Sequence, residues 1–252
     1  MHEPVDRRAT PLPSSAHALN MTWSELLFLH WRVPAAALRD AIPRALDIDE
    51  HDGSAWLGVV PFRMSEVRLR GCPKWPGTAE FPELNVRTYV RHGEQRGVWF
   101  FSLDAASWLS VRGARAWFGL PYFDARMSIE RAGEQVRYRS ERTHRRAPAA
   151  RFAARYSPSG PVQASRPGSL ERFLTSRYAL FAQRRGALLC GEIDHAPWPL
   201  QPAEVELERC EMTRLLDLEL AGEPHALYAE RLEVRAWAPG RLARSDSADA
   251  PL

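Results

Sequence analysis

Lysine is almost absent from this sequence. Of its 34 basic residues, Lys74 is the only lysine, and the others are arginines spread along the chain among 31 acidic residues. The formal net charge is therefore only +3. The densest basic stretch, residues 137–146, alternates in the way typical of a solvated strand edge, where charges discourage unwanted pairing. We expect no nucleic-acid partner, with a basic surface at this stretch as the remaining alternative.

Cysteine and long apolar runs are also scarce. The three cysteines, Cys72, Cys190 and Cys210, form no C-x-x-C pair, which is typical of a reduced cytosolic protein with structural thiols. No apolar run approaches the roughly 20 residues that cross a bilayer. Residues 1–20 lack the apolar segment of a secretory signal. We therefore expect a cytoplasmic protein without a membrane partner.

Motifs of the common catalytic folds are missing as well. The sequence contains no G-x-S-x-G, no phosphate-binding P-loop and no G-x-G-x-x-G. Without these motifs, the sequence gives no indication of an α/β hydrolase, an NTPase or a Rossmann oxidoreductase. The eight histidines are scattered, and none shows H-E-x-x-H or another ligand spacing. We expect no metal site and no cofactor.

What the sequence does contain is a series of about ten short strands, recognised by apolar patterning between Gly, Pro and Asp-Gly turns. The predicted strands cover residues 26–33, 53–70, 83–91, 98–104, 120–142 (a hairpin turning at Gly133), 151–156, 176–194 (a hairpin turning at Arg185-Gly186), 203–209 and 226–237. Helices are predicted at residues 33–43, 107–119, 169–174 and 212–220.

This pattern predicts an α+β fold that is mostly β. We expect a large antiparallel sheet, curved or partly closed, with a few helices packed on it. No shift in composition divides the chain, so a single domain over residues 21–238 is favoured. Residues 1–20 and 239–252 are predicted to be disordered tails.

The predicted strand over residues 83–91 raises the central question about function. One face is apolar, and the other carries a row of polar side chains: Glu83, Asn85, Arg87 and Tyr89. The partner strand over residues 98–104 is apolar on both faces, which is typical of a strand inside a structure. The polar row therefore lies beside a large aromatic surface, where it either forms a satisfied internal network or holds a small polar ligand.

The residue types in this row suggest a role for each member. In a ligand site, Arg87 would bind a carboxylate or carbonyl oxygen through charge-assisted hydrogen bonds. Glu83 would orient Arg87 or act as a general acid or base. Asn85 and Tyr89 would add hydrogen bonds to the same ligand. In the structural alternative, Arg87 instead compensates the buried charge of Glu83.

Several segments together resemble the DUF2071 family, which is also called YqjF-like. They are HW-x-VP (30–34), DGSAWLGVVPFRM (52–64), ELNVRTYV (83–90), FFSLDA (100–105), LPY (120–122) and FLTSRYALF (173–181). The resemblance covers about residues 21–238. The family is similar in fold to acetoacetate decarboxylase, which implies a cone-shaped antiparallel barrel with an internal cavity. This implication favours a ligand site over a structural network.

The same resemblance argues against decarboxylase chemistry. Acetoacetate decarboxylase acts through a lysine that forms a Schiff base and is activated by a neighbouring lysine. Both lysines precede a Gly-x-Pro turn that resembles residues 118–121 here, and the matching positions hold Ala116 and Trp117, which cannot form an imine. Lys74 lies in a loop beside two prolines and is expected to be exposed. The resemblance thus implies the fold without its chemistry.

Further candidate ligand-binding residues lie in the segments that carry the resemblance or close to them. Arg115 and Trp117 lie in the segment similar to the catalytic helix of the decarboxylase, and Tyr122 follows that segment. Arg177 and Tyr178 open a predicted strand, and His195 lies in a loop. Each also has an ordinary alternative: a surface arginine, a core aromatic residue, a strand-end ion pair or a turn residue.

Together these features predict a cavity protein that binds a small polar organic carboxylate or carbonyl compound. If it is an enzyme, we expect it to be lyase-like or hydrolase-like, without a Schiff base. The alternative is a non-catalytic protein whose polar row is a structural network. The open edges of a curved sheet also allow a homo-oligomer.

Overall fold

The computed structural model describes residues 11–72, 80–107, 112 and 119–242 of the chain. These residues form thirteen strands in one continuous sheet and two short α-helices. The strands are β1 (Leu19–Val33), β2 (Asp47–Ile48), β3 (Ala55–Leu69), β4 (Glu80–His92), β5 (Gln95–Ala105), β6 (Tyr122–Ala132), β7 (Gln135–Arg142), β8 (Arg151–Pro158), β9 (Ala179–Arg184), β10 (Ala187–His195), β11 (Leu200–Cys210), β12 (His225–Ala236) and β13 (Gly240–Arg241). The helices are α1 (Ala35–Arg39), α3 (Leu170–Thr175) and a 3₁₀ turn, Arg214–Leu216. None of the helices in these ranges is long and apolar enough to cross a membrane.

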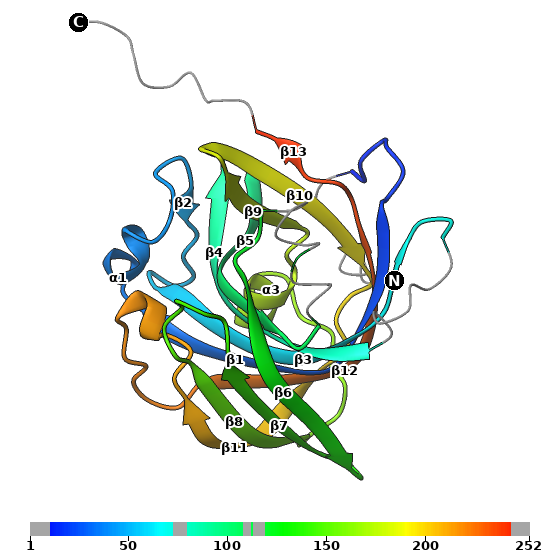
Figure 1. The fold of residues 1–252 in the computed structure, drawn as a ribbon, viewed down its shortest axis with the longest axis vertical. Coiled ribbons are helices and arrows are strands. Elements are labelled where there is room, and N and C mark those ends of the chain that lie inside the picture. Colours follow the sequence, from blue (N-terminus) through cyan, green and yellow to red (C-terminus); the bar gives the residue numbers. More distant parts are fainter. Residues whose placement is uncertain (1–10, 73–79, 108–111, 113–118, 243–252) are drawn as a thin grey trace, which may run out of the picture.

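Strand pairing closes the sheet into two rings that share five strands. Strands β12, β1, β3, β4 and β5 lie side by side and antiparallel. One ring runs from β5 through β6, β7, β8 and β11 back to β12, which makes a closed nine-stranded mixed barrel. The other ring runs from β5 through β9 and β10 to β12. Figure 1 shows β9 and β10 on the opposite side of the shared strands from β7, β8 and β11.

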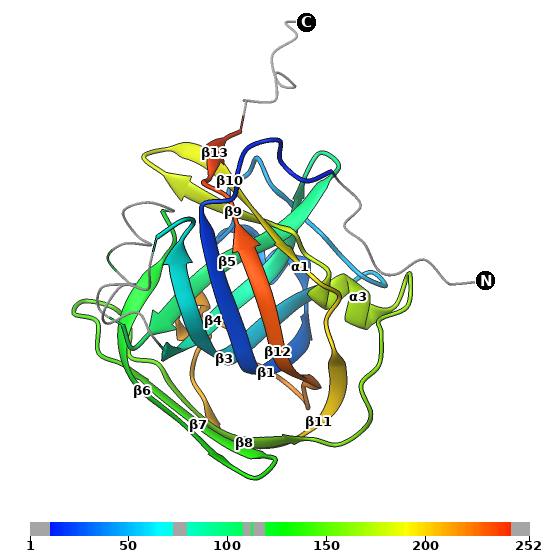
Figure 2. The same ribbon diagram turned by 90° about the vertical axis from the view of Figure 1, so that its right-hand side faces the viewer.

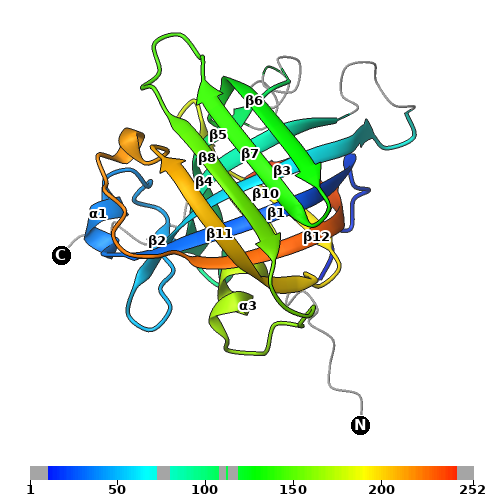
Figure 3. The same cartoon turned by 90° about the horizontal axis from the view of Figure 1, so that it is seen from below.

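The middle of β1 is apolar on both faces because each face of this shared strand looks into a different ring. In β1, Leu27 and Leu29 pack in the nine-stranded ring against aromatic residues such as Tyr138 of β7. The alternate residues Leu26 and Phe28 face the ring closed by β9 and β10. Figure 2 shows β3, β1 and β12 between these two sides, and Figure 3 shows the β6–β7–β8–β11 layer covering the shared strands from below.

The structure confirms the predicted mostly-β barrel and its three predicted hairpins. Strands β4 and β5, β6 and β7, and β9 and β10 pair as antiparallel neighbours. Gly133 adopts a positive φ of 64° at the second hairpin turn, and Arg185 and Gly186 adopt 51° and 78° at the third. Two pairings are parallel, namely β5 with β6 and β5 with β9. Because these strands arrive by long connections, their direction could not be read from local patterns.

Of the predicted helices, one is much shorter in the structure and another does not form as an α-helix. The helix expected over residues 33–43 covers only Ala35–Arg39. Beyond it, the carbonyls of Ile42, Pro43 and Leu46 accept hydrogen bonds from the Arg39 guanidinium instead of from helix N–H groups. The helix expected over residues 212–220 is wrong, because this segment forms only the 3₁₀ turn and then adopts a left-handed conformation at Asp217.

The helix expected over residues 107–119 lies largely outside the described residues.

At the chain ends, the strands extend past both predicted domain boundaries. Strand β1 begins at Leu19, and β13 pairs with β10. The Trp237 indole N–H also donates to the carbonyl of Ser15 at 2.8 Å. The first and last strands are thus set by pairing with distant strands, which the amino-acid composition of the two ends does not indicate.

Candidate functional site

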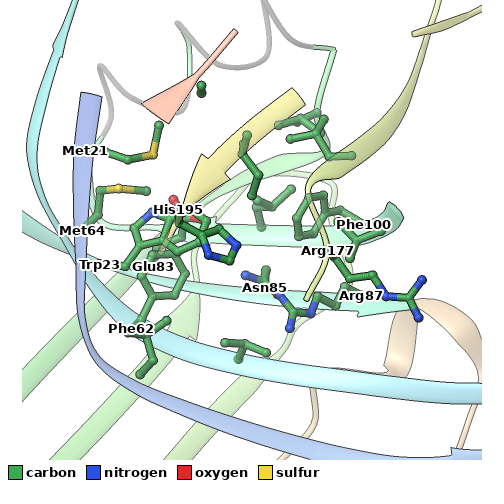
Figure 4. Close-up of a pocket in the computed structure, with 18 of the residues that line it drawn as sticks. Met21, Trp23, Phe62, Met64, Glu83, Asn85, Arg87, Phe100, Arg177 and His195 are labelled. Carbon is green, nitrogen blue, oxygen red and sulfur yellow. The ribbon is translucent and has the colours of Figure 1, made fainter. Parts of the chain in front are cut away.

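The ring closed by β9 and β10 encloses a cavity of about 510 Å³. Most of its wall is apolar and includes Met21, Trp23, Phe28, Phe62, Met64, Phe81, Phe100 and Trp198. Seven polar residues interrupt this surface: Glu83, Asn85, Arg87, Tyr122, Thr175, Arg177 and His195. Figure 4 shows Arg87 and Arg177 on the opposite side of the cavity from Met21 and Met64. A large apolar enclosure with a few convergent polar groups is the usual form of a small-molecule site.

Strand β4 contributes a row of polar side chains because every second residue faces the cavity. The row consists of Glu83, Asn85 and Arg87, which lie opposite Phe62, Val60 and Gly58 of β3, respectively. On the other side, a β-bulge in β5 near Phe101 shifts the register against β4. The bulge keeps both Phe100 and Leu103 on the cavity face.

Glu83 is an acidic group in an apolar wall. Its residue is only 3% exposed, and the hydroxyl of Tyr122 donates a hydrogen bond to its Oε2 at 3.0 Å. Burial raises the pKa of Glu83 to about 8. The Tyr138 hydroxyl, from the other ring, donates to the Glu83 backbone carbonyl at 2.7 Å. The side chain therefore holds a proton near neutral pH and is anchored where it can exchange that proton with a bound molecule.

Arg87 projects into the cavity at the α3 end of the row. One terminal nitrogen donates to the Leu174 carbonyl at 3.3 Å, and the guanidinium lies 5.6 Å from the centre of the Phe28 ring. Its buried Nε has no hydrogen-bond partner among the described residues. Gly58 permits this arrangement, because a Cβ there would lie 3.0 Å from the His30 ring and 3.3 Å from Arg87 Cγ.

Arg177 follows the C-terminal end of α3 and supplies a second cation to the same wall. Its Nη1 donates to Asp49 at 2.6 Å, and its Nε donates to the Phe173 carbonyl at 2.7 Å. The remaining nitrogen, Nη2, is buried without a partner in the described part of the chain, and so is Oδ1 of Asn85. Two guanidinium groups thus lie beside an amide in this wall, which suits an anionic or carbonyl oxygen.

His195 lines the cavity at the end of β10. Its Nδ1–H donates to the Ala196 carbonyl at 2.7 Å, and its ring stacks on Tyr178 at a centroid distance of 4.7 Å. Tyr178 is outside the cavity lining and supports His195 from behind. Tyr89 is also outside the lining: it is fully buried, and its hydroxyl is hydrogen-bonded to Nε2 of His30 at 2.7 Å.

The structure thus sorts the candidate residues into three groups. Six of them line one cavity: Glu83, Asn85, Arg87, Tyr122, Arg177 and His195. Tyr89 and Tyr178 pack behind it, and Arg115 and Trp117 lie outside the described residues. No ion pair joins Glu83 to Arg87 within the described ranges. Glu83 accepts from Tyr122, and Arg87 donates to the Leu174 carbonyl. No cluster of three or more His, Cys, Asp or Glu side chains that could hold a metal ion occurs there either.

Sequence reasoning missed Thr175 and most of the apolar wall. Phe28 carried a signal, because it alternates with Leu27 and Leu29 in a strand that is apolar on both faces. No sequence pattern indicated that Met21, Trp23 and Met64 face the cavity. The alternation along β1 and β3 is interrupted, because each strand contains a residue at positive φ, Glu25 and Glu66 respectively, next to shifts in strand register.

Comparison with known proteins places this chain among its relatives. The sequence profile of DUF2071, described as an uncharacterized conserved protein, matches residues 20–233. The chain belongs to the DUF2071 family. The "Uncharacterized protein YqjF" of Bacillus subtilis (strain 168) is similar, with 37% identity over 238 residues that cover 94% of this chain and 98% of that protein. The resemblance seen in the sequence is confirmed.

Solved structures with this fold come from the acetoacetate decarboxylase-like group. The enduracididine biosynthesis enzyme MppR, complexed with pyruvate, has a TM-score of 0.63 at 10% identity, covering 91% of this chain and 92% of its own. The acetoacetate decarboxylase of Legionella pneumophila has a TM-score of 0.62 at 13% identity, covering 93% of both chains. A decarboxylase-like enzyme from Sphingomonas wittichii RW1 has a TM-score of 0.61 at 17% identity, covering 91% and 94%. At these identities the comparison confirms the fold of the DUF2071 chain and nothing finer.

Proposed function

We propose that this cavity binds a small organic carboxylate or carbonyl compound through Arg87, with Asn85 and Arg177 beside it. The observation that carries the proposal is the pair of arginines, Arg87 and Arg177, that line one mostly apolar cavity. A guanidinium group in a mostly apolar wall loses hydration, and a ligand oxygen that accepts its hydrogen bonds offsets that loss. Charge assistance makes a carboxylate a stronger acceptor here than a neutral group.

Glu83 and Tyr122 give the proposed site a means of moving protons. A neutral Glu83 donates a proton to a developing oxyanion, and its ionised form accepts one, so a raised pKa suits both steps near neutral pH. This supports lyase-like or hydrolase-like chemistry. A Schiff base has no support, because the sequence contains a single lysine, Lys74, which lies outside the described residues.

The known ligands of one similar protein support the same chemical class. Structures of MppR are complexed with pyruvate and with the condensation product of pyruvate and imidazole 4-carboxaldehyde. Both ligands derive from an oxo acid, and MppR shares the fold of this chain. Oxo acids therefore belong in any set of compounds tested against this cavity.

A structural role for the polar row is the competing function. Arg177 is already held by Asp49 and Phe173, and Arg87 by the Leu174 carbonyl. In that case Arg87 contributes to stability and binds nothing. The two functions differ in what happens when Arg87 is replaced, because only ligand binding predicts a loss that depends on an added compound.

The test is a thermal-shift screen of the whole protein against small carboxylates, oxo acids, aldehydes and sugar acids. A ligand that binds only the folded state adds about 2.7 kcal/mol of stability at a hundred times its Kd. We expect a shift with carboxylates or oxo acids that disappears in Arg87→Met. Arg126→Met is the matched control, because Arg126 is 79% exposed on the outer sheet. Equal shifts in the parent and both variants would overturn the assignment of Arg87.

A further inference from the structure

The cavity is far longer than a two- to four-carbon acid requires. Its wall follows β4 from Arg87 at one end to Phe81 at the other. At about 3.3 Å per residue, this stretch of strand spans roughly 20 Å. A volume of about 510 Å³ also falls within the range of roughly 300–1,000 Å³ that encloses drug-sized ligands. A pyruvate-sized molecule bound at Arg87 would leave most of this space unfilled.

Beyond Glu83, the described part of the wall is mostly apolar. The exception is His195 of β10, whose strand partner Val234 also pairs with Met21. Met64 of β3 lies between Trp23 of β1 and Phe81 of β4 in the strand register, and all three line the cavity. Met21 extends this surface toward Leu69, which also lines the cavity and is 44% exposed. Methionine side chains adapt their shape to flexible apolar groups. The cavity thus has a cationic end and a long apolar end that reaches the protein surface.

We propose that the ligand is an elongated amphipathic monocarboxylate. Its carboxylate binds at Arg87 and Arg177, and its acyl or aryl body runs along β4 toward Met64 and Met21. This inference rests on the proposed carboxylate site and adds the substrate class: an acid with a large apolar body and not a short oxo acid. Such a ligand offers an oxygen acceptor to the two guanidinium groups that line the cavity and also fills its apolar length.

A chain-length series tests this directly. The dissociation constant of the whole protein is measured for acetate, butanoate, hexanoate, octanoate, decanoate and dodecanoate, each below its micelle-forming concentration, with pyruvate and acetoacetate beside them. Each buried methylene should lower the Kd about fourfold. The gain should level off once the chain reaches the exposed end at Leu69. A Kd that does not fall with chain length, or that is lowest for the short oxo acids, would overturn the inference.

A variant that fills the apolar end supplies the second measurement. Met21 is only half-buried, so Met21→Trp is the first choice, with Met64→Trp as the replacement if that variant does not fold. We expect the affinity for decanoate and dodecanoate to drop at least tenfold while the affinity for hexanoate is kept. Met127→Trp, a half-buried methionine of β6 outside this cavity, should change neither. A uniform loss for every chain, or no loss for any, would contradict the proposed placement of the apolar body.

Failure of this inference differs visibly from failure of the proposed function. If short oxo acids bind, depend on Arg87 and gain nothing from added methylenes, the carboxylate site stands and the elongated ligand is wrong. If no carboxylate of any length binds, or binding survives Arg87→Met, the site itself is wrong.

Discussion

Tyr122 and Glu83 are 39 residues apart in the chain, yet the Tyr122 hydroxyl donates a hydrogen bond to Glu83 Oε2 at 3.0 Å. The two residues belong to β6 and β4, which lie on either side of β5. Both side chains are buried, and burial raises the pKa of each. Their contact places a protonated carboxyl group and a phenol in the wall of a mostly apolar cavity, so Glu83 should make the stability of this protein depend on pH.

Replacing Glu83 by Gln should make the protein more stable at high pH than the parent. The pKa of Glu83 is about 8 in the folded protein against 4.5 ordinarily. Between these values the unfolded chain loses its proton while the folded protein keeps it, so the Glu83 contribution to stability falls as pH rises. The difference between Glu83→Gln and the parent should grow by about 1.4 kcal/mol per pH unit in this window.

Denaturant unfolding at pH 4.5, 6 and 8 measures this difference. Gln keeps an oxygen that accepts from Tyr122, so the local geometry is retained. Glu141→Gln is a suitable control, because Glu141 is half-exposed on the outer sheet and its replacement should give no such trend. A stability difference for Glu83→Gln that is constant with pH would show that Glu83 is ionised throughout.

Replacing Tyr122 by Phe should move the titration of Glu83 further upward. The Tyr122 hydrogen bond favours the ionised carboxylate and lowers the pKa of Glu83 against the effect of burial. Its removal should therefore place the midpoint above about 8. Carbon NMR of the Glu83 carboxyl, assigned by its loss in Glu83→Gln, measures the midpoint. A lower midpoint in Tyr122→Phe would contradict the proposed role of the hydroxyl.

Replacing Gly58 by Ala should displace Arg87. The added Cβ would lie 3.0 Å from the His30 ring and 3.3 Å from Arg87 Cγ, and overpacking of this kind costs about 1–3 kcal/mol. We expect a lower melting temperature and a weaker carboxylate Kd. Gly240→Ala is the matched control, because a Cβ there meets nothing within 4 Å. Unchanged stability and affinity in Gly58→Ala would show that the position of Arg87 does not depend on the absence of a side chain at residue 58.

Replacing Arg177 by Met should destabilise the fold strongly. Arg177 and Asp49 form a buried ion pair, with side chains 5% and 6% exposed, and removal of one partner from such a pair costs about 3–5 kcal/mol. The pair of Arg235 and Asp194 gives the comparison, because its side chains are 49% and 18% exposed and Arg235→Met should cost about 1 kcal/mol or less. Adding Asp49→Asn to Arg177→Met should recover part of the loss. Similar losses for Arg177→Met and Arg235→Met would mean that the buried pair is solvated in solution.

Much of the fold was readable from local patterns. The alternation from Leu84 to Val90 located β4, and the glycine turns at Gly133 and Gly186 located two hairpins. Such patterns record which residues face an apolar environment and where the backbone must reverse, and both are local properties. The same alternation groups Glu83, Asn85 and Arg87 into one polar row, because side chains two residues apart in a strand point the same way.

Other features of the site could not be read in this way. An ion pair of Glu83 with Arg87, one of the alternatives that the sequence left open, does not occur among the described residues. Glu83 accepts a hydrogen bond from Tyr122 of β6, and Arg87 donates one to Leu174 of α3. Tyr89 continues the alternation of the polar row, yet it does not line the cavity. Its hydroxyl is hydrogen-bonded to His30, and its ring packs on Phe173. Alternation identifies a face of a strand, but it does not say what covers that face at each point.

The sequence by itself determined the strands, the polar row of β4 and the lack of lysines for a Schiff base, because these depend on residue type and on spacing along one segment. Only the tertiary structure decided that β5 is shared by two rings, that Tyr122 meets Glu83, and that Met21 and Arg177 line the same cavity. Those relationships join residues far apart in the chain. They depend on how strands pair across the closed sheet, and no single segment of the sequence contains that information.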